Sequence, residues 1–109
     1  MARVSRAKLQ AIERAFHQLI VRRLAEFPGV PTPILPKLQL PLPTARSPAW
    51  LPVPGMYGGF CYWLEGRDES ATLISESWSR VVGGSAERHA ITASGARLLE
   101  AGFDMPPGT

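Results

Sequence analysis

The feature that constrains this chain most is a concentration of proline in its second quarter. Residues 28 to 54 hold nine of the eleven prolines. Proline has no backbone N–H and clashes with a preceding helical turn, so this density excludes a helix and any central strand. The segment is too apolar for a disordered linker, and Leu38, Leu40 and Leu42 alternate as in a half-buried edge strand. We expect an extended strap across the core.

Residues 5 to 27, which precede the strap, have the periodicity of an amphipathic helix. Apolar side chains recur at every third or fourth position, with charged residues opposite them. Ser5 can cap the start, and Pro28 and Gly29 end the helix. Such a helix is longer than a small sheet can cover, so we expect part of its stripe to meet a second copy or another protein. The alternative is that the whole stripe packs on the chain's own sheet. The interface residues predicted in this way are Leu9, Ile12, Phe16 and Leu19.

The next segment is typical of a small antiparallel meander. Aromatic and β-branched residues occur in short runs between glycine pairs, and strands are predicted over 58 to 65, 72 to 82 and 86 to 92. Thr92 can then cap a short helix with Leu98 and Leu99 on its apolar side and Gly102 as its stop. The predicted fold is therefore an α+β single domain. Its parts are a long N-terminal amphipathic helix (1–27), a Pro-rich extended strap (28–54), a three-stranded antiparallel β-meander (55–92), a short C-terminal helix (93–103) and a tail (104–109).

Composition narrows the class of protein. A chain of 109 residues that is 45% apolar can build one core, and no run approaches the roughly 18 apolar residues of a membrane span. The single Cys61 cannot form an internal disulfide, so we expect a cytoplasmic protein. The first 27 residues carry six basic against two acidic side chains, which makes the helix the basic part of the chain.

The predicted middle strand has an unusual face. Alternation places Glu76, Trp78 and Arg80 together, opposite a row of serines. These three are too polar for plain core, and Arg88 of the next strand is the nearest candidate to pair with Glu76. We expect an open partner-binding surface made of Glu76, Trp78, Arg80 and Arg88, in which Trp78→Ala costs less than about 1.5 kcal/mol of stability.

Catalytic and metal-binding patterns are weak in this sequence. Cys61, Glu76 and His89 are the residue types of a nucleophile, an orienting acid and a base. A thiol in mid-strand between aromatic residues is expected to be buried, with a raised pKa, and therefore inert. His17 and His89 are far apart and no pair of ligands has metal-site spacing, so neither a metal nor a cofactor is predicted.

One segment gives an alternative. Residues 83 to 89, followed by Gly95 and then Gly102 with Phe103, resemble the C-terminal end of NAD glycohydrolases of the tuberculosis-necrotizing-toxin type. Glu87 stands where that family has glutamine, and the proline-rich half has no counterpart of its upstream NAD-binding elements. The resemblance implies a nucleotide site made of Arg80, Ser85, Glu87 and His89.

These observations favour an intracellular protein-interaction module without catalytic activity. We expect an accessory, inhibitory or regulatory subunit of bacterial or phage origin that binds a macromolecular partner through its sheet face and its helix. The alternatives are a small NAD-processing enzyme or ADP-ribose-binding domain, and a nucleic-acid-binding protein that uses the basic helix. No membrane partner is expected.

Overall fold

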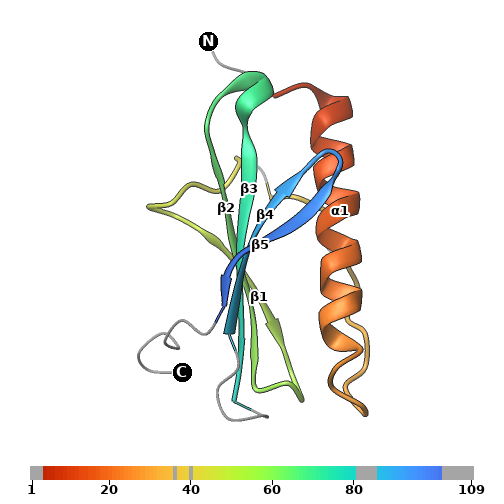
Figure 1. Cartoon of the computed structure of the whole chain (residues 1–109). Helices are drawn as coiled ribbons and strands as arrows, with labels where there is room; N and C mark the ends of the chain where they lie inside the picture. The colour runs from red at the N-terminus through yellow and green to blue at the C-terminus, as the bar shows by residue number, and fades with distance from the viewer. Residues whose placement is uncertain (1–3, 36, 40, 81–85, 102–109) are drawn as a thin grey trace.

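One helix lies across one face of a five-stranded antiparallel sheet (Figure 1). The computed structural model describes residues 4–35, 37–39, 41–80 and 86–101. The elements are helix α1 (Arg6–Leu24), strands β1 (Ala49–Val53) and β2 (Gly58–Glu65), the short 3-10 helix η1 (Asp68–Ser70), and strands β3 (Thr72–Ser79), β4 (Ala86–Thr92) and β5 (Gly95–Ala101). Each strand pairs with its neighbours in sequence, in the order β1-β2-β3-β4-β5.

Helix α1 begins and ends close to its predicted bounds. The Ser5 hydroxyl accepts a hydrogen bond from the Lys8 amide at 3.2 Å, which satisfies one of the free N–H groups of the first turn. A helix of 19 residues is roughly 28 Å long and a strand of eight residues roughly 26 Å, so α1 matches the length of β2 and β3. The expectation that the helix is too long for its own sheet is therefore wrong.

The apolar stripe of the helix forms the core. Ile12, Phe16 and Leu19 are buried against the chain's own sheet, and Leu9 is partly covered. The Phe16 ring packs edge-on to Phe60 of β2, with ring centroids 6.4 Å apart. Full burial of such a side chain contributes about 1.5 to 3 kcal/mol. The predicted helix interface is thus occupied within one chain, and we no longer assign it to a partner.

The proline-rich segment packs on the core as a strap, but its strand lies elsewhere than predicted. Leu35 and Leu38 pack against the core, and the Leu38 amide donates to the Glu13 carboxylate at 2.7 Å. Leu38 and Leu42 are not in a strand, and residue 40 lies outside the described residues. The edge strand is instead β1, which pairs with β2 and includes Pro52 at the rim of the sheet.

The end of the chain departs from the predicted fold. The sheet has five strands where three were expected, and β5 occupies Gly95–Ala101, within the predicted C-terminal helix. Thr92 is in register with Gly95, and the Thr92 hydroxyl donates to the Gly95 carbonyl at 3.0 Å, so the chain turns back as a tight hairpin. Pairing with β4 satisfies the backbone of residues that could also have formed a short helix. Gly102 and Phe103 lie outside the described residues.

Candidate functional site

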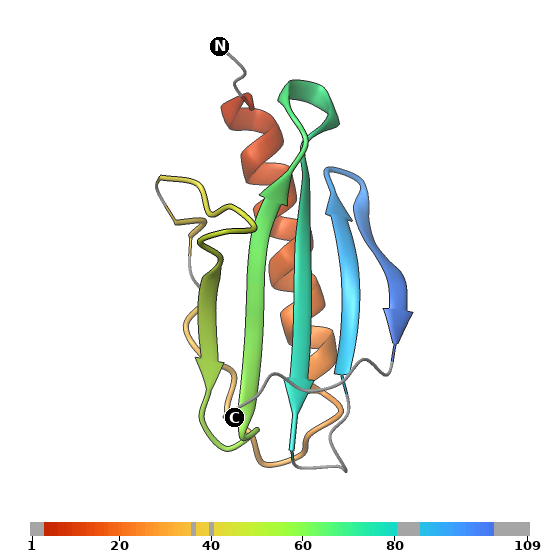
Figure 2. The same cartoon turned by 90° about the vertical axis from the view of Figure 1, so that its left-hand side faces the viewer.

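The side of the sheet that faces away from α1, which we call the outer face, carries the tryptophans. Figure 2 views this side, with the helix behind the strands. Phe60 and Phe16 are in contact, so alternation along β2 directs Gly59, Cys61 and Trp63 away from the helix. The register then adds the outer-face residues of the neighbouring strands. These are Trp50, Ile74, Glu76, Trp78, Arg88 and Ala90.

Two tryptophans stack on this face. The rings of Trp50 and Trp78 are 5.5 Å apart and inclined by 15°. Trp78 is only 6% exposed, whereas Trp50 is 48% exposed. Gly59 lies between their strands, and a Cβ at this position would come within 3.0 Å of the Trp50 ring. The expectation that Trp78 is an exposed recognition residue is therefore wrong, because Trp50 and the sheet cover it and Trp50 takes the exposed position.

The predicted pairing of Glu76 with Arg88 is present. An Arg88 guanidinium nitrogen lies 2.7 Å from the Glu76 carboxylate, and both side chains are partly exposed. Cys61 is in register with Glu76 on the neighbouring strand. Burial, and secondarily the negative charge of Glu76, raise the pKa of the Cys61 thiol. Cys61 is only partly buried, where full burial was expected, and its raised pKa leaves less of the nucleophilic thiolate at neutral pH.

Arg80 lies apart from this row. It follows the last residue of β3 at an exposed bend, and its amide donates to the Tyr57 carbonyl at 3.3 Å. Tyr57 is 71% exposed and has a φ of 53°, in the left-handed region that costs a residue other than glycine about 1 kcal/mol or more. Sequence reasoning missed Tyr57 and Trp50, because neither exposure nor a strained φ has a signature in the local pattern.

The opposite side of the sheet, which we call the inner face, carries a buried polar cluster beneath α1. Arg23 lies 3.1 Å from the Glu87 carboxylate and 3.2 Å from that of Glu26. His89 Nε2 is 3.6 Å from Glu87. Burial lowers the pKa of His89; Glu87 opposes this shift, and Arg22 and Arg23 add to it. The serines of β3 lie on this same face, and Ser75 is in register with His89.

The sheet divides the predicted catalytic set, and its inner face holds two residues of the predicted nucleotide site. Cys61 and Glu76 lie on the outer face, so the sheet stands between them and His89, and the three cannot act together. For the nucleotide alternative, Glu87 and His89 come together, but they face α1, and Glu87 is bound by Arg23. Arg80 lies at the bend after β3, and Ser85 is outside the described residues.

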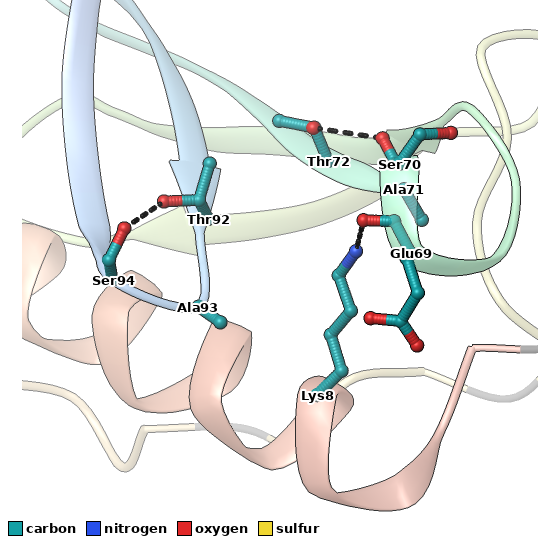
Figure 3. Close-up of a pocket in the computed structure, with 8 residues that line it drawn as sticks. All are labelled: Lys8, Glu69, Ser70, Ala71, Thr72, Thr92, Ala93 and Ser94. Carbon is teal, nitrogen blue, oxygen red and sulfur yellow. Dashed lines mark hydrogen bonds between the residues drawn. The ribbon is translucent and has the colours of Figure 1, made fainter.

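A pocket opens at one end of the sheet, between the first turn of α1, η1 and the β4–β5 turn (Figure 3). The Lys8 ammonium donates to the Glu69 carbonyl across it. The Thr92 and Ser94 hydroxyls are hydrogen-bonded to each other at 3.0 Å. These hydrogen bonds already link α1 to η1 and stabilise the β4–β5 turn. We therefore interpret the polar groups of the pocket as structural and do not include them in the candidate site.

No helix within the described segments combines the length and the apolar character that a membrane span requires. Nor do three His, Cys, Asp or Glu side chains of these segments gather where they could hold a metal ion. The chain matches no protein-family model, no curated protein and no solved structure with which it was compared.

Proposed function

We propose that this chain is a small protein-interaction module, an accessory, inhibitory or regulatory subunit that binds a protein partner through its outer face. The observation that carries the proposal is the half-exposed Trp50 ring, which lies on the buried Trp78 ring. Tryptophan is usually well covered in folded proteins and is enriched at binding surfaces, so a half-exposed indole held against a buried ring favours a role in binding.

Trp50 has the properties of an anchor. Its ring is fixed from below by Trp78 and by the close approach of Gly59, so it would lose little side-chain freedom on binding. Tryptophan, tyrosine and arginine are the residues that most often dominate binding energy at interfaces. Trp50 and Arg88 lie on the outer face, and the exposed Tyr57 lies in the turn that precedes β2.

The distribution of charge favours a protein partner over a nucleic acid. Binding of a single strand needs aromatic rings and unneutralised cations in the same groove. The exposed basic residues Arg6, Arg14 and Arg22 belong to α1, on the opposite side of the sheet from Trp50. On the outer face itself, the Arg88 charge is met by Glu76. The exposed cations of α1 are therefore separated from Trp50 by the thickness of the sheet, and Arg97, which is opposite Ala90 in β5, lies at the sheet edge farthest from Trp50.

The test begins with cross-linking in cell lysate to nominate a partner, which is then purified and titrated by calorimetry. Trp50→Ala should weaken binding by about tenfold or more, as expected for an anchor residue. Ile34→Ala is the matched control, because Ile34 is an exposed apolar residue of the strap and not of the sheet. Equal affinity of wild type and Trp50→Ala would contradict the proposal. So would Trp50-dependent binding of single-stranded RNA or DNA with no protein partner.

A further inference from the structure

The proline-rich strap turns back after α1 and runs along the helix (Figure 1). Leu35 lies beside the C-terminal part of α1, where it lines a hollow with Val21. Leu38 lies beside the middle of the helix, because its amide donates to the Glu13 carboxylate at 2.7 Å. The strap thus passes α1 in the antiparallel direction, and the two segments meet along a seam.

Two hollows open along this seam. The larger one, of about 520 Å³, lies near the C-terminal end of α1 and is mostly apolar. Its walls are His17, Gln18, Val21, Arg22 and Leu35. The smaller one, of about 260 Å³, lies toward the start of α1, where Leu38 and Leu42 of the strap contribute to its apolar lining. Val21 is 47% exposed, although valine is among the residues most often buried in proteins. The hollows can therefore receive aliphatic side chains from another molecule.

The rims of the two hollows are positively charged. Arg22 borders the larger hollow, and Arg6 and Lys37 border the smaller one. These three side chains are exposed, and none of them lies in an ion pair with a carboxylate of the described segments. Glu13 is the one carboxylate among the described residues that line the hollows, and it accepts the Leu38 amide. The seam is therefore complementary to a ligand that is both aliphatic and acidic.

The spacing of the hollows sets the length of the ligand. The α1 residues that line them are centred about ten positions apart, which is roughly 15 Å along the helix axis. In an extended chain, side chains at positions i and i+4 point to the same side and are roughly 13 Å apart. We propose that the seam binds an extended, acidic segment of another protein. Two aliphatic side chains of this segment, with this spacing, enter the hollows, and the neighbouring carboxylates meet Arg6, Arg22 and Lys37.

The apolar hollows favour a protein segment over a nucleic acid. A phosphate backbone could meet the three cations, but it has no aliphatic side chain to fill the hollows. The inference goes beyond the proposed function and does not depend on it. The seam is formed by α1 and the strap, whereas Trp50 lies on the face of the sheet that points away from α1.

The experiment is a titration of a labelled peptide with the full chain, followed by fluorescence anisotropy at low salt. The probe is Gly-Asp-Leu-Asp-Glu-Asp-Leu-Asp-Gly, which has two leucines at the proposed spacing. One comparison peptide replaces the acidic residues with Asn and Gln, and another replaces the leucines with Ser. Each should bind at least about tenfold more weakly than the probe, because each lacks one half of the complementarity. Equal binding of all three peptides, or no saturation of the probe at about 1 mM protein, would overturn the proposal.

Variants of the protein locate the binding site. Arg22→Glu and Lys37→Glu should each weaken probe binding by about tenfold, because each reverses a charge at the rim of a hollow. Val21→Asp should have a similar effect, because it places a carboxylate in the larger hollow. The matched control is Arg97→Glu, which makes the same charge change at an exposed position of β5, outside the seam. It should leave the affinity within about twofold of that of the wild type.

Circular dichroism of each variant checks that a loss of binding is not a loss of the fold. If Arg97→Glu weakens binding as much as Arg22→Glu does, only the net charge attracts the probe, and the assignment to the seam is overturned. A DNA duplex that binds more tightly than the probe, and whose binding is lost in Arg22→Glu, would assign the cations to a nucleic acid and would also overturn the proposal.

Discussion

At the residue scale, the two stacked tryptophans have different parts in the molecule. Trp78 is 6% exposed and Trp50 is 48% exposed, although the two rings are in contact. The buried ring supports the fold, and the exposed ring is available to a partner.

We predict that Trp78→Ala lowers the free energy of unfolding by about 3 to 5 kcal/mol, as is typical when a buried tryptophan leaves a cavity. Trp50→Ala should cost about 1 to 2 kcal/mol, because much of its ring is already in water. Urea unfolding of the two variants measures the difference. A cost below about 1.5 kcal/mol for Trp78→Ala would show that the ring is not core.

At the element scale, the pairing of β1 with β2 depends on the absence of a side chain at Gly59. A Cβ there would lie 2.4 Å from the Leu51 carbonyl oxygen and 2.9 Å from the Pro52 Cα. Both are backbone atoms of β1, so relief requires the strand itself to move. Glycine at this position thus allows the edge strand to approach and to bring Trp50 over Trp78.

Gly59→Ala should therefore destabilise the protein by about 2 to 3 kcal/mol, the upper range for an overpacked site. A Cβ at position 59 can clash with the β1 backbone or with the Trp50 indole, and the double variant with Trp50→Ala distinguishes these two clashes. Because the closest contacts are with backbone, removal of the indole should restore little of the loss. Thermal unfolding of the single and double variants gives the comparison, and full recovery in the double variant would place the strain on the indole instead.

At the scale of the whole molecule, α1 packs on the sheet over the polar cluster of Arg23, Glu87 and His89, whose charge depends on pH. His89 is buried beneath α1, and its Nδ1 has no hydrogen-bond partner among the described residues. Burial lowers its pKa in the folded protein, against a contrary effect of Glu87. The unfolded chain, with a histidine pKa of about 6.5, therefore takes up this proton first as the pH falls.

The sign of the effect follows from this order of protonation. The contribution of His89 to stability is fully present above about pH 6.5 and is lost as the pH falls through the lower pKa of the folded state. We predict that the melting temperature of the wild type falls from pH 8 to pH 5 more steeply than that of His89→Gln. Calorimetric scans across this range test the prediction, and equal slopes would show that the imidazole does not couple to folding.

Local sequence determined several elements of this protein. Ser5 caps the predicted helix, and β2 and β4 have the predicted bounds, Gly58–Glu65 and Ala86–Thr92. Alternation also placed Glu76 and Trp78 on one face, with Arg88 in reach of Glu76. These features depend on backbone periodicity, caps and turn residues, which act over a few neighbouring positions.

Tertiary structure decided what those short-range signals leave open. Both faces of β3 carry residues that can be buried, so the local pattern does not indicate which face of the sheet α1 covers. The docking of α1 places Ser75 and His89 on the inner face and leaves Trp50 partly exposed on the outer face. Residues 93 to 101 lie between the predicted caps of a short helix, yet Gly95–Ala101 forms β5, because the open edge of β4 offers it a ladder of backbone hydrogen bonds. Such a ladder depends on residues distant in sequence, and a local pattern does not contain it.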